Sequence, residues 1–334
     1  MKHLLLLCAS LCLFSCGTSG SNGANDEFAP LLRPLDLSLR NSDGGVEVRA
    51  AGEPFATVRF DDPAGPCVHP LIGCNGERVT RGFPMDPGPD DSQDHPHHRS
   101  LWFAHGDVGG VDFWHKGGTI QTLGYEADLT QPGRVSLLLD LSWRDGDGRE
   151  VLQETRRYSF GANGRERWID ISHSMRGAGR GVLFGDTKEG TFALRVAPSM
   201  RVEGPVAAGT LVNAEGLSGR DVWGKRSPWI AASGPIADGS GQTREITVAL
   251  FDHPKNLRYP TWWHARTYGL LAANPFGTQA FEGRMQEASG RYYLDAGEVL
   301  TLRYRVLIGS RTLTTEELAA TSLTFGGPVD GALN

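Results

Sequence analysis

The segment from Asp94 to His115, DHPHHRSLWFAHGDVGGVDFWH, holds five of the ten histidines of the chain. Three aspartates, one arginine and four bulky aromatic residues lie among them. Imidazoles next to carboxylates can transfer protons or bind a metal ion. Because burying so many polar groups without a use is costly, we expect this segment to carry a function.

Proton transfer on a sugar needs an imidazole with a pKa near neutrality and a carboxylate a few ångströms away. The sequence offers catalytic candidates of these two types in three separate segments: His98, His105, Asp186, Glu189 and His264. We predict that His98 or His105 is the general acid and that Glu189 or Asp186 is the base. Such a pair predicts a bell-shaped dependence of activity on pH.

Other residues of the same three segments, 94–115, 184–195 and 250–277, could bind the substrate. Arginines would bind acidic or hydroxyl groups, tryptophan rings would stack on sugar rings, and aspartates would orient the histidines. The predicted substrate-binding set is Asp94, Arg99, Trp102, Asp107, Lys188, Arg195, Trp263, Arg266 and Asn274. Because loops at strand ends carry function on β scaffolds, we expect the three segments to converge on one face of the fold.

A metal site is the alternative for the same histidines. Two or three histidines with a carboxylate form the usual ligand set of catalytic zinc or non-haem iron, and His97, His98 and His105 are the candidates. Pro96 favours an extended backbone at His95, which would turn His98 away from His95 and His97. The spacing matches no recognised metal motif such as H-E-x-x-H. We therefore predict no resident cofactor and leave a divalent metal open.

The first residues, MKHLLLLCASLCLFSC, predict export. The apolar run after the charged start is too short to span a bilayer and is typical of a signal peptide. LFSC resembles the lipobox of bacterial lipoproteins, which implies that residues 1–15 are removed and that Cys16 is acylated. Gly17, in place of an aspartate, implies the outer membrane of a Gram-negative bacterium. A plain signal peptide is the alternative, and residues 16–30 are expected to form a flexible tether.

Cysteine content and charge narrow the class of protein further. In an exported chain, Cys67 and Cys74 in the loop GPCVHPLIGCNG predict a disulfide, and a metal pair is less favoured because no second cysteine pair exists. The formal net charge is −6 and no run of lysine or arginine occurs. This composition argues against a nucleic-acid-binding protein, which would carry a basic patch.

Residues 31–334 are predicted to form one β domain. LDLSLR, VEVRA and FATVRF alternate apolar and polar residues, and two longer strands flank the turn DGDGR. In RERWIDISHSM the alternation places Ile169, Ile171, His173 and Met175 on one face. No strand is followed by a regular helix, which disfavours a parallel sheet. We predict an all-β fold, a large antiparallel β-sandwich.

The end of the chain carries the clearest local signals. In GEVLTLRYRVLIGS, apolar residues from Leu300 to Ile308 alternate with Thr301, Arg303 and Arg305. In TTEELAATSLTF, Thr314 and Glu317 have the spacing of a capping box, which predicts one short C-terminal helix.

Four segments together resemble a known bacterial family. DHPHHRSLWFAHGDVGGVDFW, FGDTKEGTFALRV, HPKNLRYPTWWHARTYGLLAANPFG and LTLRYRVLIG resemble, in this order, the methane oxygenase PmoA-like family, from about Pro34 to Ser310. That resemblance implies a secreted protein of the kind found in polysaccharide-degrading bacteria. The strand pattern is also similar to the galactose-mutarotase-like sandwich, which implies sugar chemistry by a histidine acid and a carboxylate base on a concave sheet face.

Three functions follow as hypotheses. The first is an exported lipoprotein of carbohydrate metabolism, acting as an epimerase, hydrolase or lyase by acid–base chemistry. The second is a zinc, iron or copper hydrolase or oxygenase that uses the histidine-rich segment. The third is a glycan-binding lipoprotein without catalysis. All three expect a saccharide or other small molecule as ligand, contact with a membrane only through the lipid anchor, and no nucleic acid.

Overall fold

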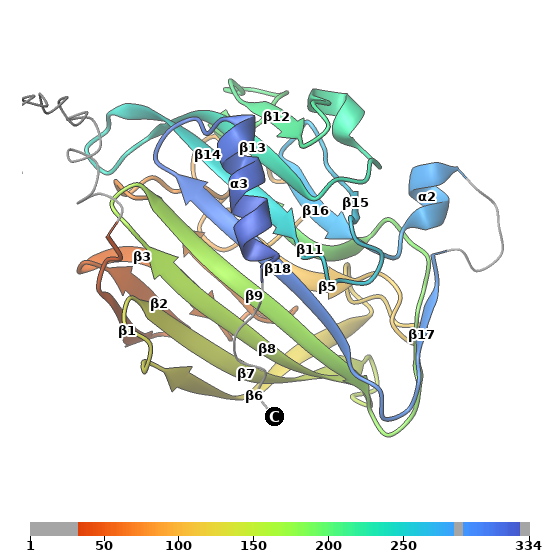
Figure 1. The fold of residues 1–334 in the computed structure, drawn as a ribbon. Helices are drawn as coiled ribbons and strands as arrows, with labels where there is room; N and C mark the ends of the chain where they lie inside the picture. The colour runs from red at the N-terminus through yellow and green to blue at the C-terminus, as the bar shows by residue number, and fades with distance from the viewer. Residues whose placement is uncertain (1–32, 284–289, 328–334) are drawn as a thin grey trace, which may run out of the picture.

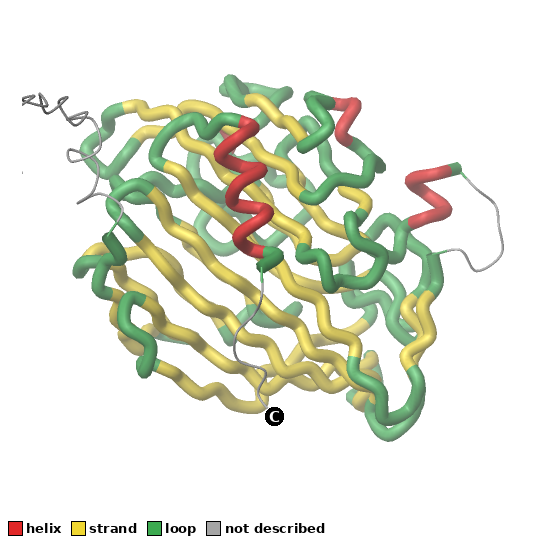
Figure 2. Tube along the Cα trace, viewed as in Figure 1, coloured by secondary structure: helices red, strands yellow, loops and turns green. Residues whose placement is uncertain are grey.

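Two eight-stranded antiparallel sheets pack face to face in the computed structural model, which describes residues 33–283 and 290–327 (Figure 1). Strands far outnumber helices in the described part of the chain (Figure 2). The predicted all-β antiparallel sandwich is therefore confirmed. The predicted signal peptide and the whole of the predicted tether, including Cys16, lie outside the described residues.

The first sheet takes strands from the beginning, the middle and the end of the chain. Its order is β1-β2-β3-β4-β5-β11-β16-β15. The strands are β1 (Leu37–Ser42), β2 (Gly45–Ala50), β3 (Glu53–Arg59), β4 (Cys67–Leu71), β5 (Leu101–His105), β11 (Gly190–Arg195), β16 (Leu270–Asn274) and β15 (Trp262–Trp263). Residues far apart in sequence are thus neighbours in the centre of this sheet.

The second sheet is built mainly from long hairpins. Its order is β12-β13-β14-β18-β9-β8-β7-β6. The strands are β12 (Thr210–Asn213), β13 (Trp229–Ala237), β14 (Thr243–Asp252), β18 (Leu300–Gly309), β9 (Glu166–Gly177), β8 (Glu150–Ala162), β7 (Arg134–Asp145) and β6 (Gly118–Asp128). A small separate pair joins β10 (Val182–Phe184) to β17 (Tyr292–Leu294).

Within residues 33–283 and 290–327, two α-helices accompany the sheets. Helix α3 (Thr315–Phe325) begins with the predicted capping box, because the Thr314 side chain accepts from Glu317 N–H and the Glu317 side chain accepts from Thr314 N–H. It lies across the outer face of the second sheet (Figure 1), where Leu318 packs against Trp229 and other apolar residues of that face. Helix α2 (Thr278–Glu282) was not predicted, since five residues are too short for a helical period.

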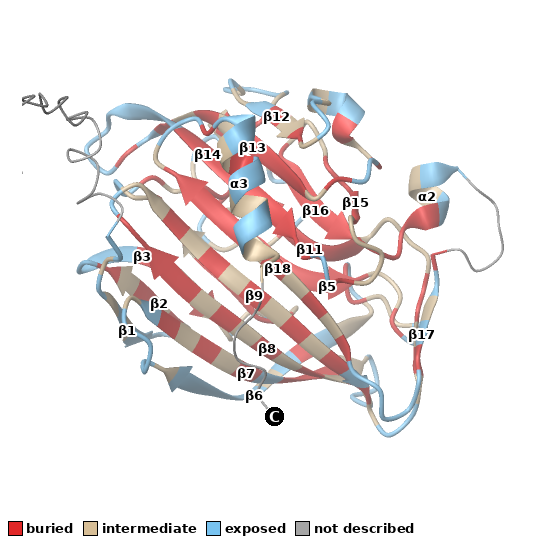
Figure 3. Ribbon diagram, in the orientation of Figure 1, coloured by how far each residue is buried: buried red, intermediate tan, exposed pale blue. Residues whose placement is uncertain are grey.

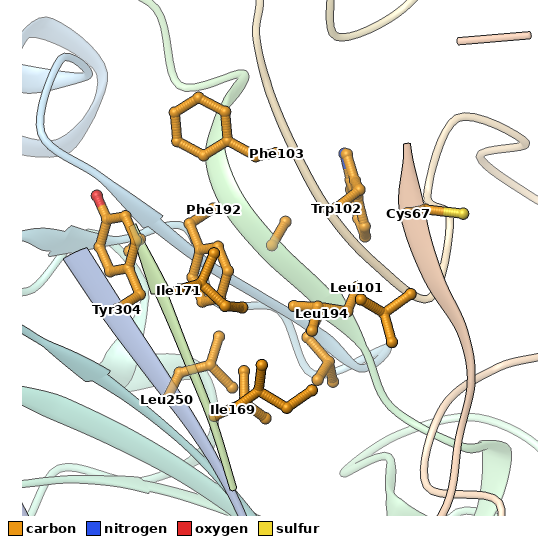
Figure 4. Close-up of a cluster of buried hydrophobic side chains, with 14 of the residues drawn as sticks. Cys67, Leu101, Trp102, Phe103, Ile169, Ile171, Phe192, Leu194, Leu250 and Tyr304 are labelled. Carbon is orange, nitrogen blue, oxygen red and sulfur yellow. The ribbon is translucent and has the colours of Figure 1, made fainter. Parts of the chain in front are cut away.

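Strict alternation builds the core between the sheets. Buried and half-buried residues alternate along β9 and much of β18 and appear as bands in Figure 3. The inward aromatic residues meet across the gap (Figure 4): the Phe192 ring of β11 stacks on Tyr304 of β18 with centroids 4.5 Å apart. Burying one such side chain stabilises the fold by roughly 1.5–3 kcal/mol. The inward faces predicted for β9 and β18 are therefore confirmed.

A fully buried ionic cluster lies within this apolar core. The carboxylate of Glu154 accepts hydrogen bonds from Arg156 Nε (2.7 Å), Trp143 Nε1 (2.8 Å) and His173 Nδ1 (2.8 Å). Burial would raise the pKa of Glu154, but Arg156 and His173 outweigh it and lower the pKa to about 2. The cluster thus carries a paired charge, and its carboxylate accepts from three surrounding side chains.

The predicted disulfide is wrong. Cys67 begins β4 and Cys74 lies beyond its end, and both thiols are free. An extended strand rises about 3.3 Å per residue, so β4 carries the two cysteines apart. Burial raises the pKa of Cys67 to about 12 and that of Cys74 to about 11. Such thiols are poor nucleophiles at neutral pH.

No helix within residues 33–283 and 290–327 is both long and apolar enough to cross a bilayer.

Candidate functional site

A pocket of about 580 Å³ lies over the outer face of the first sheet. In β5 and β11, Phe103 and Leu194 point to the core, so Trp102 and Arg195 point outward beneath this pocket. Residues 95–98 and 115, 188–189, and 264–268 line it, together with residues between 203 and 223. The three predicted segments do converge, and a fourth segment that was not predicted joins them.

The histidines at 95, 97 and 98 form a turn. His95 has a left-handed backbone (φ 45°), and His98 N–H donates to His95 O at 3.0 Å. The ring centroid of His98 is 4.7 Å from that of His95 and 4.6 Å from that of His97. The expectation of an extended backbone at His95 is therefore wrong, and all three rings meet at one wall of the pocket.

Arg81 stabilises this turn with hydrogen bonds. Its side chain is buried, and it donates to Asp94 Oδ1 (2.7 Å), to His95 O (2.9 Å) and to His98 O (3.1 Å). These bonds tie down the backbone at both ends of the turn and offset the cost of about 1–2 kcal/mol of the left-handed residue. Burial lowers the pKa of Arg81 to about 10, so it stays charged at neutral pH. Sequence reasoning missed this residue.

Asp94 receives both buried arginines. Its Oδ1 accepts from Arg81 Nη1 at 2.7 Å and from Arg195 Nη2 at 3.0 Å. Its Oδ2 lies 3.1 Å from His95 Nδ1, which agrees with the predicted role of orienting a histidine. Burial would raise the pKa of Asp94, but Arg195, His95 and Ser92 lower it to about 2. The carboxylate is therefore ionised and committed to the support of the turn.

His98 is a neutral hydrogen-bond donor. Arg195 Nη1 donates to its Nδ1 at 3.1 Å, and a guanidinium has only donors, so the ring proton must be on Nε2. Burial, together with the charge of Arg195, holds the pKa of His98 far below its usual value. Trp102 stacks beneath the ring at 5.2 Å and is itself buried. His98 therefore does not fit the general-acid role, and Trp102 supports His98 rather than a sugar ring.

Lys188 and Glu189 form an ion pair at the wall of the pocket. Lys188 Nζ donates to Glu189 Oε1, and both residues line the pocket. Burial would raise the pKa of Glu189, but Lys188 and His264 outweigh it and lower the pKa. Asn274 Nδ2 donates to Thr187 O at 2.9 Å and so positions the segment that carries the pair. Glu189 is an ionised carboxylate at neutral pH, as a base requires.

His264 uses both ring nitrogens within the protein. Its Nδ1 donates to Lys188 O at 2.8 Å, and its Nε2 accepts from Arg266 Nε at 3.2 Å. Burial lowers the pKa of His264 to about 4. It therefore positions the Lys188 backbone and Arg266, whose guanidinium carbon lies 4.9 Å from the centroid of the Trp223 ring.

His115 is the imidazole best placed for proton transfer. Its Nδ1 lies 2.9 Å from Asp112 Oδ2, and both side chains are about two-fifths exposed, at 42% and 41%. The His115 ring lies 4.5 Å from His97, and no residue in the described part of the chain hydrogen-bonds its Nε2. The sequence prediction assigned no acid–base role to this pair, although its D-x-x-H spacing was a usable signal.

Several predicted site residues lie outside the pocket. His105 points into the core with Phe103, its Nε2 donates to Gly185 O at 2.9 Å, and burial lowers its pKa to about 4. The other residues have partners within the protein. Asp107 accepts from Gly110 N–H, and Asp186 accepts from Gln279 N–H and Gly290 N–H. Arg99 pairs with Asp62, and Trp263 donates to Ser227 O. Catalytic roles for His105 and Asp186, and binding roles for Asp107, Arg99 and Trp263, do not fit these positions.

The predicted metal ligands do not meet. His97 and His98 line the pocket, whereas His105 lies on the core side of β5. Within residues 33–283 and 290–327, no group of three or more histidine, cysteine, aspartate or glutamate side chains is arranged to hold a metal ion.

The chain belongs to a family of unknown function, DUF6807, whose model matches residues 45–322. No curated protein matches the chain. None of the comparisons supports the resemblance to the methane oxygenase PmoA-like family.

Solved structures match the chain at low sequence identity. A galactose mutarotase-like protein from Clostridium acetobutylicum is 11% identical, with a TM-score of 0.41, over 83% of this chain and 99% of that one. A galactose mutarotase related enzyme from Lactobacillus acidophilus is 9% identical, with a TM-score of 0.30, over 84% and 97%. A GH36 alpha-galactosidase from Geobacillus stearothermophilus is 12% identical, with a TM-score of 0.39, over 83% of this chain. The chain spans about 40% of the length of that alpha-galactosidase.

Proposed function

We propose that the pocket binds a saccharide and catalyses proton transfer on it, as epimerisation, hydrolysis or elimination requires. The observation that carries the proposal is that His115, oriented by Asp112, and the ionised Glu189 line the same pocket. A carboxylate base and an imidazole held by a second carboxylate are the groups that proton transfer needs.

The remaining lining suits a polyhydroxylated ligand. A volume of about 580 Å³ is within the usual range of small-molecule sites. His98 offers a fixed Nε2–H, and Lys188 and Arg266 offer charged donors. Tyr268 and Trp223 contribute aromatic rings to the wall. Fixed donors aimed at a developing negative oxygen stabilise it more than mobile water does.

Each residue then has a defined task. Glu189 takes a proton from the substrate, and His115 delivers or accepts the second proton at Nε2 while Asp112 stabilises the charged ring. His98 donates to an oxygen of the substrate without changing its own charge. Arg81, Asp94 and Arg195 keep His98 in place and touch no substrate.

The test is a panel of oligosaccharides incubated with the purified protein and followed by proton NMR. Glu189→Gln and His115→Gln should each lower kcat by about 10²–10⁴ with little change in affinity. Glu203→Gln is the matched control, because Glu203 also lines the pocket but is paired with Arg220 at its rim. Full activity in both Glu189→Gln and His115→Gln would refute the proposal.

The glycan-binding alternative is favoured by one observation. His97, His98 and His264 have pKa values well below neutrality, so three of the five imidazoles of the pocket do not exchange protons at pH 7. This alternative expects saturable binding of a saccharide by the wild type and by Glu189→Gln, with no turnover of any member of the panel.

The metal-dependent alternative has its own test. Elemental analysis of the purified protein, beside His97→Ala/His98→Ala, should find no stoichiometric metal if the acid–base proposal holds. One metal per chain that is lost in the double variant would replace that proposal.

We also propose that the protein is exported and anchored by lipid at Cys16. The apolar start of the chain and the LFSC segment support this proposal. Labelled palmitate should enter the wild type and not Cys16→Ser, and the wild type should fractionate with the outer membrane.

A further inference from the structure

A second cavity, of about 360 Å³, lies on the outer face of the second sheet, on the opposite side of the sandwich from the pocket. Residues of β7, β8, β9 and β18 line it, and the C-terminal end of α3 borders it. Figure 1 shows α3 lying across this face of the sheet. The proposed saccharide chemistry uses none of these residues.

Arginines dominate the lining. Arg134 comes from β7, Arg157 from β8, and Arg303 and Arg305 from β18, which β9 separates from β8. Asp170 of β9 is the one acidic residue that lines the cavity in the described part of the chain. Their side chains lie on the outer face because the residues between them, such as Tyr304, are buried in the core. The lining thus gathers four guanidinium groups on one face of a chain whose net charge is −6.

The nearby negative charges do not balance this cluster. Asp170 Oδ2 accepts from Arg305 Nη2 at 2.9 Å and lies 3.8 Å from Arg134 Nη1, so one carboxylate serves two arginines. Arg157 Nη1 lies 4.0 Å from Asp128. Arg303 has no carboxylate partner within the described residues. The C-terminal end of α3 adds only about half a negative charge, so an excess of positive charge persists.

His253 supplies an independent sign that a ligand belongs here. Its Nδ1 accepts from Lys255 N–H at 3.0 Å, which leaves the ring proton on Nε2. That nitrogen is buried and has no hydrogen-bond partner within residues 33–283 and 290–327, and His253 is only 1% exposed. A buried donor without an acceptor costs about 1–3 kcal/mol, and His253 lines the cavity. The ring of Phe325 lies edge-on to this imidazole with centroids 5.1 Å apart, and an oxyanion oxygen that reached Nε2 past it would remove this cost.

We propose that this cavity binds a tetrahedral oxyanion, phosphate or sulfate, either free or as an ester group of a larger ligand. Guanidinium forks match the geometry and charge of such an oxyanion, and a neutral imidazole N–H donates to its oxygens. Arg303, with no carboxylate partner, forms the principal contact. The site is separate from the saccharide pocket, so either assignment can fail without the other.

Calorimetric titration of the full-length protein tests the proposal, with inorganic phosphate and inorganic sulfate at an ionic strength held constant with chloride. Saturable binding is expected, and Arg303→Gln should weaken it at least tenfold. Arg176→Gln is the matched control, because Arg176 is on the same face of the sheet but donates to Gln153 outside this cavity. No saturable binding, or equal weakening in both variants, would overturn the proposal.

Two further measurements keep the result interpretable. The melting temperature of Arg303→Gln in chloride shows whether it folds, and Arg157→Gln replaces it if it does not. The Nε2–H resonance of His253 should shift with the same midpoint as the heat signal, and a resonance that does not move contradicts the proposal. Titration with glycerol phosphate and with a sulfated disaccharide shows whether the oxyanion is free or part of an ester. If the ester binds more tightly than the free ion, the site is assigned to an ester group of a larger ligand. If the ester binds more weakly, the site is assigned to the free ion.

Discussion

Arg195 donates a hydrogen bond from Nη1 to Nδ1 of His98 at 3.1 Å. This bond fixes the proton of His98 on Nε2, because arginine cannot accept. In the same pocket, Arg266 donates to Nε2 of His264, whose Nδ1 donates to Lys188 O. Two imidazoles of one pocket are therefore held in opposite tautomers, each by its own arginine.

The first prediction concerns these tautomers. Long-range nitrogen–proton NMR should find the proton on Nε2 in His98 and on Nδ1 in His264, without change from pH 5 to 8, because burial lowers both pKa values. Arg195→Met should release only His98, and Arg266→Met only His264, so each variant is the control for the other. Identical tautomers, or titration of His98 in this range, would contradict the structure.

The second prediction concerns Arg81. Arg81→Met removes bonds to Asp94 and to two carbonyls of the histidine turn and leaves a half-buried carboxylate with one partner fewer. We expect the free energy of unfolding to fall by about 3–5 kcal/mol, measured by urea denaturation. Arg78→Met is the control, since Arg78 forms an exposed pair with Asp86 and should cost at most about 1 kcal/mol. Equal effects would show that Arg81 does not support the turn.

The third prediction concerns acid stability. Burial lowers the pKa of His105, His173 and His264 to about 4, from an ordinary value of 6.5. Between these two values the unfolded chain binds protons that the folded chain does not, so stability must fall as pH falls from 6.5 towards 4. Each imidazole contributes about 1.4 kcal/mol per pH unit to the slope. Unfolding free energies measured by urea denaturation at pH 7, 6, 5 and 4 check the expectation.

His173→Gln should make that dependence shallower by one proton, because burial keeps the His173 imidazole neutral in the folded protein. An unfolding free energy that stays constant from pH 6.5 to 5 would be inconsistent with buried neutral histidines.

The fourth prediction concerns the buried cluster in the core. Glu154→Gln keeps the shape of the side chain but leaves the charge of Arg156 without a counter-charge in a fully buried place. The expected loss in the free energy of unfolding is about 3–5 kcal/mol. Glu150→Gln, on the same strand, provides the comparison, because Glu150 accepts from Ser142 near the surface and has no buried cation. A loss below about 1 kcal/mol for Glu154→Gln would show that Arg156 finds other compensation.

The strands were predictable because their signal is local. Alternation along β9 and β18 depends on neighbours two residues apart, and the capping box of α3 on residues three apart. The backbone of His95 was not predictable in this way. Pro96 favours an extended conformation, but Arg81, fourteen residues away, bonds to His95 O and stabilises the turn. A long-range contact thus overrides a local preference.

The site was predictable at the level of segments and less so at the level of roles. Their content of histidine, carboxylate, arginine and tryptophan identified three segments that do meet at the pocket. Whether a residue in them can catalyse or bind depends on the face of its strand on which the side chain lies. His105 shares the inward face of β5 with Phe103, a consequence of alternation that the sequence already contained. The tautomer of His98 depends on Arg195, almost a hundred residues away, and no local pattern carries that information.

The strand order of the first sheet has a consequence for how the protein is assembled. The pocket takes residues from 95 to 268, and β11 pairs with β5 although four strands of the second sheet, β6 to β9, lie between them in the chain. Pairings between strands so distant in sequence form slowly during folding. A chain that ends before β16 contains the histidine turn but lacks the strand that lies beside residues 264–268 of the pocket. Ligand binding would therefore show that the whole sandwich has folded. A bound ligand would in turn stabilise both sheets together, because it binds only the finished fold.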